Sequence, residues 1–178
     1  MNNFIQMLTY FRIIAGPIIF FLIVVFQSFG IALFILILAS VSDYWDGYLA
    51  RKYSLTSVLG AVLDPIADKI LITFVLLALV LALDSIFIAS LGCVILAREF
   101  WVGALRDFNA RNGNEAATTV TFLAKIKTTM QLLSFCWILT GLYFNNALMI
   151  FLGNFFLFLA LIITMQTGLS YTIATFKK

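Results

Sequence analysis

The chain has 178 residues, of which 63% are hydrophobic and 11% are charged, and its formal net charge is +3. With a mean hydropathy of +1.11, this composition lies outside the range of a water-soluble domain. It excludes a soluble enzyme and predicts a protein of the lipid bilayer, with membrane lipid as a partner and no nucleic-acid partner.

Six apolar runs are each long enough to cross the hydrocarbon core of a bilayer as a helix, which takes about 20 residues. In chain order they cover residues 8–26, 30–49, 58–83, 85–105, 118–143 and 148–171. The first run is expected to be retained, because it is long and no convincing signal-peptide cleavage site follows it. We therefore predict an all-α fold in which residues 1–178 form one polytopic membrane domain, a bundle of six transmembrane helices.

The basic residues predict the orientation of this bundle. All eleven Lys and Arg residues fall on one side of the alternating pattern of spans, with Arg12 assigned to the entry of the first span. The three opposite turns, around residues 27–29, 84 and 145–146, contain no Lys or Arg. By the positive-inside rule the charged side faces the cytoplasm. We expect both termini and the active site on that side of a bacterial-type inner or cytoplasmic membrane.

Four aspartates lie at the cytoplasmic ends of the second and third spans, where a carboxylate is costly and needs a counter-charge. Each helix carries its aspartates on one stripe with small residues: Asp43, Asp46, Gly47 and Ala50 on the first, and Gly60, Asp64 and Asp68 on the second. The chain contains no histidine, and hard carboxylate ligands favour Mg²⁺ or Mn²⁺ over zinc. Four carboxylates are enough to hold two such ions and leave positions open for phosphate oxygens.

Two other interpretations of the aspartates stay open at this point. They could be solvated acids that cap helices or pair with Arg51, Lys52 and Lys69. They could also form the ion path of a cation or proton transporter. A transporter, however, would distribute its acidic residues through the depth of the membrane, whereas these four lie at one face.

The segment that carries these aspartates resembles the signature of the CDP-alcohol phosphatidyltransferases. It reads Asp43-Tyr44-Trp45-Asp46-Gly47-Tyr48-Leu49-Ala50-Arg51, then eight residues, Gly60, three residues, Asp64, three residues and Asp68. Every fixed position of the motif is matched, which makes the resemblance specific. It extends to the whole chain, because the family core has six helices with both termini in the cytoplasm.

This resemblance assigns roles to the motif residues. It implies that Asp43, Asp46, Asp64 and Asp68 hold two metal ions that grip the pyrophosphate of a CDP-lipid. Asp68 is then also the base that deprotonates the attacking hydroxyl. The residues implied to bind the CDP-lipid are Gly47, Ala50 and Gly60, which leave room for the cytidine, and Arg51, which steadies a phosphate. The family resemblance also suggests a homodimer.

Within the family, the sequence is most similar to the phosphatidylglycerophosphate synthase branch, which transfers a phosphatidyl group from CDP-diacylglycerol to glycerol 3-phosphate in phospholipid biosynthesis. Three segments carry this similarity: Leu8-Thr9-Tyr10-Phe11-Arg12, Ala97-Arg98-Glu99 with Arg106, and Lys125-Ile126-Lys127-Thr128 with Gln131. A phosphorylated acceptor calls for basic residues. The residues expected to bind its phosphate are Arg98, Arg106, Lys125 and Lys127.

The choice of acceptor has alternatives. The basic residues could serve membrane topology alone or pair with Glu99 or Asp107. The sequence also departs from the branch pattern, with Ile5 and Gln6 in place of Pro-Asn, Phe122 in place of Lys and Ala124 in place of Gly. A sister phosphatidyltransferase that uses inositol phosphate, serine or phosphatidylglycerol is therefore an alternative.

Overall fold

A computed structural model describes residues 2–53, 58–113 and 122–176, with the side chains at 2–5, 46–53, 58–59, 61 and 122–125 left out of the description. These ranges fold into helices alone: α1 (Asn2–Val24), α2 (Phe29–Tyr53), α3 (Val58–Leu83), α4 (Ile86–Arg111), α5 (Phe122–Phe144) and α6 (Ala147–Phe176). Each predicted span corresponds to one of these helices. The all-α prediction is therefore confirmed for the described residues.

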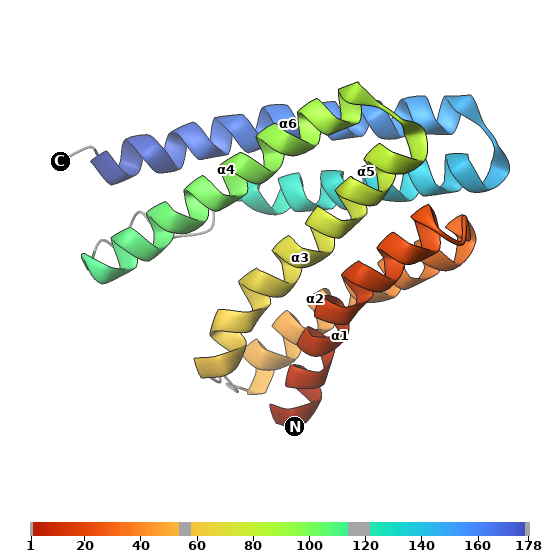
Figure 1. Cartoon of the computed structure of the whole chain (residues 1–178). Coiled ribbons are helices and arrows are strands. Elements are labelled where there is room, and N and C mark those ends of the chain that lie inside the picture. Colours follow the sequence, from red (N-terminus) through yellow and green to blue (C-terminus); the bar gives the residue numbers. More distant parts are fainter. Residues whose placement is uncertain (1, 54–57, 114–121, 177–178) are drawn as a thin grey trace.

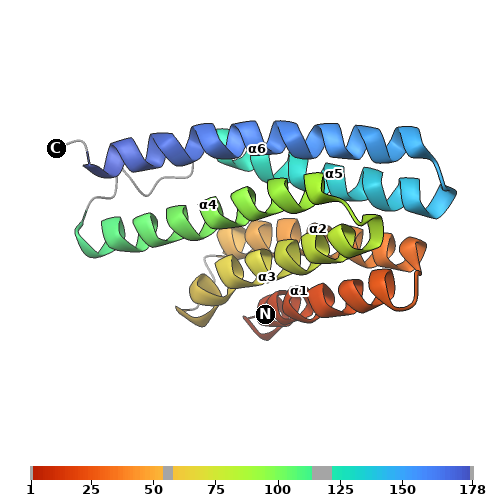
Figure 2. The ribbon, with the colours of Figure 1, turned by 45° about the horizontal axis from the view of Figure 1, so that its top comes forward.

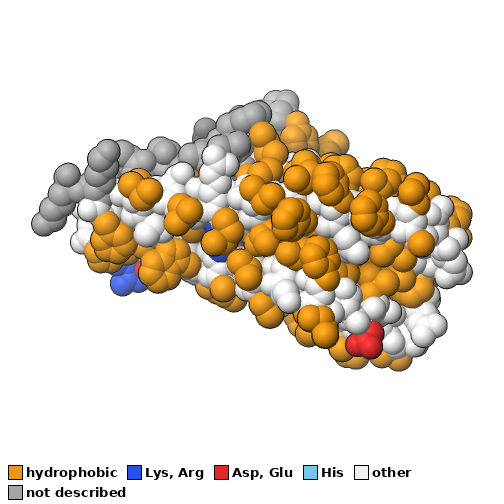
Figure 3. Space-filling view, turned by 90° about the horizontal axis from the view of Figure 1, so that it is seen from above, with side chains coloured by type: hydrophobic (Ala, Val, Ile, Leu, Met, Phe, Trp, Pro, Cys, Tyr) orange, Lys and Arg blue, Asp and Glu red, His pale blue; other side chains and the backbone are white. Residues whose placement is uncertain are grey.

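The surface of the helices matches a lipid environment. Four segments are long and apolar enough to cross a membrane: Gln6–Val24, Val62–Leu83, Ile86–Arg111 and Ala147–Phe176. The apolar part of α2 with described side chains, Phe29–Trp45, is shorter. Figure 3 shows one long face of the bundle covered mostly by hydrophobic side chains. That all six helices cross the membrane stays a prediction.

Tight turns connect α1 to α2, α3 to α4 and α5 to α6. Each turn contains a residue with a left-handed backbone: Gln27 (φ 50°), Asp84 (φ 44°) and Asn145 (φ 51°). The side-chain oxygens of Ser85 and Asn146 then accept hydrogen bonds from backbone N–H groups at the starts of α4 and α6. Such caps satisfy donors that have no partner within the first turn of a helix.

The helices run up and down the bundle (Figure 2), and α1, α2 and α3 are inclined to α5 and α6 (Figure 1). The starts of α1, α3 and α5 and the ends of α2, α4 and α6 therefore lie toward the same end of the bundle. Helix α1 packs against α2 and α3, α5 packs against α2 and α6, and α4 packs against α3 and α6. In the described part of the chain, α2 and α3 do not pack closely on each other. The aspartates of these two helices must therefore be brought together by something else.

Helices α5 and α6 approach each other closely at two glycines, Gly141 and Gly153. A Cβ atom added to Gly153 would lie 3.0 Å from the backbone nitrogen of Ile138 and 3.0 Å from the carbonyl oxygen of Ser134. Small residues allow membrane helices to pack this closely, since van der Waals contact replaces the hydrophobic effect as the force between them. Gly153 therefore permits the close spacing of α5 and α6 at this position.

We expect Gly153→Ala to destabilise the protein by about 1–3 kcal/mol, because the added methyl group pushes two backbones apart. Gly92→Ala is a matched control, since its Cβ would meet only the side chain of Leu76, at 3.5 Å or more. That change should be neutral or stabilising by up to about 1 kcal/mol. Thermal unfolding in detergent compares the two variants, and equal unfolding temperatures would contradict the proposed role of Gly153.

Candidate active site

A buried arginine contacts three of the four aspartates that the sequence singled out. Arg12 lies on α1 with its side chain only 1% exposed. Its Nη1 atom donates to Oδ1 of Asp43 and, at 2.7 Å, to Oδ1 of Asp68, while Nη2 donates to Oδ1 of Asp64 at 3.0 Å. One turn earlier, the hydroxyl of Thr9 donates to the same oxygen of Asp64 at 2.8 Å. Helices α1, α2 and α3 therefore converge on one charged cluster.

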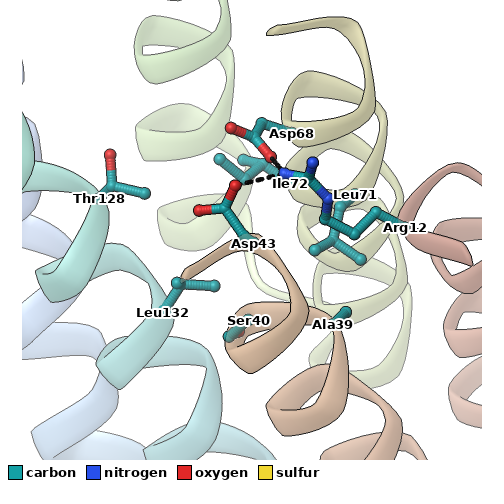
Figure 4. Close-up of a pocket in the computed structure, with 9 residues that line it drawn as sticks. All are labelled: Arg12, Ala39, Ser40, Asp43, Asp68, Leu71, Ile72, Thr128 and Leu132. Carbon is teal, nitrogen blue, oxygen red and sulfur yellow. Dashed lines mark hydrogen bonds and ion pairs between the residues drawn. The ribbon is translucent and has the colours of Figure 1, made fainter. Parts of the chain in front are cut away.

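The cluster keeps an excess of negative charge. The side chains of Asp43, Asp64 and Asp68 are 51%, 43% and 43% exposed, so each carboxylate reaches solvent while its Oδ1 atom contacts Arg12. One guanidinium offsets only one of these three charges. Figure 4 shows the second oxygens of Asp43 and Asp68 pointing away from Arg12, to the side where Thr128 lies. Two negative charges are thus presented toward α5.

A pocket opens where these second oxygens point. Its cavity volume is about 20 Å³, and it is lined by residues of α1, α2, α3 and α5. These residues are Arg12, Ala39, Ser40, Asp43, Asp68, Leu71, Ile72, Thr128 and Leu132. Asp68 lines the pocket, whereas Asp64 is held against Thr9 and Arg12 outside the lining. The two aspartates of α3 are therefore not equivalent.

The cation at the centre of the cluster is the guanidinium of Arg12. Among the described side chains, no group of three or more Asp, Glu, His or Cys residues is arranged to hold a metal ion, and the side chain of Asp46 lies outside the description. The donor set nevertheless fits a hard divalent cation, because carboxylate oxygens with excess negative charge face the pocket. The chemistry of these residues thus suits the predicted metal, while its coordination stays a prediction.

The second charged cluster is basic and joins α4, α5 and α6. Oε1 of Glu99 accepts from Nη1 of Arg98 at 3.0 Å and from Nζ of Lys127. The side chains of Arg98 and Lys127 are each 8% exposed. Arg98 also donates through Nη2 to the hydroxyl of Thr167 at 2.6 Å. The expected pairing with Glu99 therefore exists for both cations.

Arg106 adds a third positive charge near this cluster. Its Nη2 atom donates to the hydroxyl of Tyr171 at 2.8 Å, and its guanidinium carbon lies 4.9 Å from the centre of the Tyr171 ring. The three cations are close enough to repel one another electrostatically. Glu99 offsets only one of these charges. The basic cluster, defined as Arg98, Arg106 and Lys127, is therefore suited to bind an anion.

Helix α5 links the two clusters. Thr128 lines the pocket beside Asp43 and Asp68, and its neighbour Lys127 belongs to the basic cluster. A negatively charged site and a positively charged site thus lie next to each other along α5. This arrangement suits two phosphate-containing substrates. The acidic site would bind one of them through divalent cations, and the basic site would bind the other directly.

Comparison with known proteins identifies the family. The family model of the CDP-alcohol phosphatidyltransferases matches residues 3–166. The chain belongs to this family. It is 32% identical to the protein of Shigella flexneri serotype 5b (strain 8401) named CDP-diacylglycerol–glycerol-3-phosphate 3-phosphatidyltransferase, over 95% of this chain and 92% of that protein. Proteins of the same name from Escherichia coli (strain K12) and Escherichia coli O157:H7 match with the same identity and coverage.

Membership in the CDP-alcohol phosphatidyltransferase family makes the protein an enzyme and sets the transporter hypothesis aside. Of the family motif, the structure brings together Asp43, Asp64 and Asp68, while Gly60 lies partly buried on α3. The side chains of the other motif positions lie outside the described residues, as does that of Lys125. Those positions are Asp46, Gly47, Ala50 and Arg51.

One interpretation left open by the sequence paired the aspartates with Arg51, Lys52 and Lys69, and the side chains of Arg51 and Lys52 lie outside the described residues. The ammonium of Lys69, the third of these cations, lies 5.7 Å from the ring centre of Phe100 on α4, within the range of a cation–π contact. Arg12, to which the sequence analysis assigned no role in the site, makes the described ion pairs with the aspartates. A signal for its role was present, because Thr9 and Arg12 belong to the segment that resembles the phosphatidylglycerophosphate synthase branch.

We expect Arg12→Ala to lower the stability of the metal-free enzyme, since three carboxylates would lose a common charged partner. Hydrogen bonds to charged groups contribute about 1.5–3 kcal/mol each, and the exposure of the aspartates reduces this value. The measurement is thermal unfolding in detergent with EDTA. Arg12→Lys should restore only part of the loss, because an ammonium lacks the planar fork of a guanidinium.

Arg111→Ala is the matched control for Arg12. Arg111 is 77% exposed and pairs with Asp107 one turn away on α4, a surface pair of the kind that contributes at most about 1 kcal/mol. If Arg12→Ala and Arg111→Ala unfold at the same temperature, the cluster does not depend on Arg12.

Proposed function

We propose that this enzyme transfers the phosphatidyl group of CDP-diacylglycerol to glycerol 3-phosphate in phospholipid biosynthesis. A hydroxyl oxygen of glycerol 3-phosphate bonds to the phosphatidyl phosphorus, and the bond from that phosphorus to CMP breaks. The products are phosphatidylglycerol phosphate and CMP. The proposal draws on the names of the relatives that match along almost the whole chain.

The single observation that carries the proposal is the adjacency of two clusters of opposite charge. The aspartate cluster presents an excess of negative charge to the pocket. The basic cluster beyond Thr128 carries an excess of positive charge. A diphosphate bound through metal ions needs the first, and a phosphorylated alcohol needs the second. An acceptor without a phosphate would leave the single carboxylate of Glu99 to offset the three positive charges of Arg98, Arg106 and Lys127.

Asp43, Asp46, Asp64 and Asp68 would hold two divalent cations, Mg²⁺ or Mn²⁺. Bound there, these ions would neutralise charge on the diphosphate of the CDP-lipid. The position of Asp68 supports its further role as the base that accepts the proton of the attacking hydroxyl, because its second oxygen faces the pocket. Asp64 is tied to Thr9 and Arg12 and serves as a ligand.

The acceptor phosphate is assigned to Arg98, Arg106 and Lys127, together with Lys125. The side-chain amide of Gln131 is suited to bind the hydroxyl groups of the acceptor. Gln131 lies one turn after Lys127 on α5 and is fully buried, and neither atom of its amide has a hydrogen-bond partner among the described residues. An unpaired buried amide costs about 1–3 kcal/mol. Hydroxyl groups of glycerol 3-phosphate would satisfy it.

The same proposal gives the enzyme its place in the cell. All six helices cross a bacterial inner membrane, with both termini and both charged clusters on the cytoplasmic side. The asymmetry of Lys and Arg supports this orientation. CDP-diacylglycerol, glycerol 3-phosphate and metal would then arrive from the cytoplasm or the inner leaflet. The enzyme would work among membrane lipids as a homodimer.

Metal dependence tests the aspartate assignments. We expect no turnover of CDP-diacylglycerol with glycerol 3-phosphate in excess EDTA and full turnover when Mg²⁺ is restored. Asp68→Asn should keep CDP-diacylglycerol affinity within a few-fold, while kcat falls by about 10² or more, since asparagine cannot take up the proton. Asp64→Asn should weaken CDP-diacylglycerol binding, and added Mg²⁺ should partly restore it. Rescue of Asp68→Asn to wild-type turnover by Mg²⁺ would make Asp68 a ligand only.

The acceptor assignment has its own test. Arg98→Ala and Arg106→Ala should each raise KM for glycerol 3-phosphate by roughly one to two powers of ten and leave KM for CDP-diacylglycerol nearly unchanged. A lost charge-assisted contact of about 1.5–3 kcal/mol gives this range. Arg111→Ala should change neither constant. Faster release of CMP with serine, inositol phosphate or phosphatidylglycerol than with glycerol 3-phosphate would point to a sister enzyme.

A further inference from the structure

The contact between α4 and α6 holds a row of side-chain hydrogen bonds. Two of them orient arginines of α4, namely Arg98 to Thr167 and Arg106 to Tyr171. Two others involve neutral partners, Trp101 to Thr172 at 3.0 Å and Asn109 to Thr175 at 2.8 Å. Hydrogen bonds between side chains contribute to the packing of membrane helices, but a bond to an arginine also fixes the position of a charged group. The two bonds to arginines therefore raise the question of what they do for the basic cluster.

The Arg98 side chain lies directly across one glycine of α6. A Cβ atom added to Gly168 would be 3.0 Å from Nε and 3.1 Å from Cγ of Arg98. The hydroxyl of Thr167 is itself held by α6, because it lies 2.9 Å from the carbonyl oxygen of Ile163 and 3.0 Å from that of Thr164. Its proton is used there, so its lone pairs are turned toward Arg98. Gly168 thus supplies the space for the arginine and Thr167 supplies the acceptor.

Arg106 is held by a different pair of contacts. The Tyr171 hydroxyl accepts from Nη2, and the ring of the same residue lies under the guanidinium at 4.9 Å. Tyr171 is 5% exposed and lies one turn beyond Thr167 on α6. One short segment of α6 therefore restrains both guanidinium groups of the basic cluster.

We propose that Thr167, Gly168 and Tyr171 are positioning residues that set the affinity of the enzyme for the phosphate of its acceptor. This inference rests on the proposed function, in which Arg98 and Arg106 bind that phosphate. A guanidinium has five N–H donors. Thr167 and Glu99 each accept from one terminal nitrogen of Arg98, which leaves further donors for an anion. Holding the side chains in advance lowers the entropy that phosphate binding must otherwise remove.

The test compares matched substitutions along the α4–α6 contact. Thr167→Val and Gly168→Ala should raise KM for glycerol 3-phosphate tenfold or more, with KM for CDP-diacylglycerol unchanged within twofold. Thr167→Ser should leave KM for glycerol 3-phosphate close to its original value, since serine keeps the hydroxyl. Tyr171→Phe should raise it less than Arg106→Ala, because the ring contact remains. Thr172→Val and Gly92→Ala make the same chemical changes where no arginine is held and should leave both KM values unchanged.

A second readout avoids turnover. The concentration of glycerol 3-phosphate that gives half of its maximal thermal stabilisation in detergent should rise tenfold or more in Thr167→Val and stay unchanged in Thr172→Val. If Thr167→Val and Gly168→Ala leave both readouts unchanged while Arg98→Ala raises the acceptor KM, the positioning role is overturned and the phosphate site stands. If Arg98→Ala and Arg106→Ala also leave the acceptor KM unchanged, the phosphate assignment fails and the positioning role fails with it.

Discussion

A guanidinium inside a bundle of apolar helices needs counter-charges within hydrogen-bond reach, because an unpaired buried charge is far more costly than a paired one. Arg12 meets this need with carboxylates from two other helices. Helices α2 and α3 do not pack closely on each other, and α1 packs against both. The position of Arg12 on α1 therefore decides where the aspartates meet, and the pocket and the proposed roles of the aspartates follow from that meeting point.

The second constraint is that two clusters of opposite charge lie close together without neutralising each other. Their side chains project from different helices, and local partners hold each set. Arg12 and Thr9 restrain the aspartates, while Glu99 and Thr167 restrain the cations. Long side chains can bridge only a few ångströms, so the excess charge on each side stays available. An enzyme that transfers a phosphatidyl group from a CDP-lipid to a phosphorylated alcohol can use two such sites side by side.

The helices thus divide their tasks. Helices α1, α2 and α3 carry the aspartate cluster, and α4 and α5 carry the basic residues. Helix α6 contributes no charged side chain in its described length, yet Thr167, Gly168 and Tyr171 restrain two arginines of α4. Polar residues in a membrane helix are costly unless they have such partners. The role of α6 is therefore to hold the residues that neighbouring helices supply.

The sequence by itself determined the all-α architecture, because apolar runs of membrane length leave no other way to satisfy the backbone. It also singled out the aspartates, since carboxylates at helical spacing beside small residues form a pattern that one chain reveals. The partners of these side chains were decided only by the tertiary structure. Arg12, Thr167 and Tyr171 lie far from their partners in sequence, and helical periodicity shows which residues share a face but not which helix that face meets. Which helices meet depends on how all six pack, as the close approach at Gly153 illustrates.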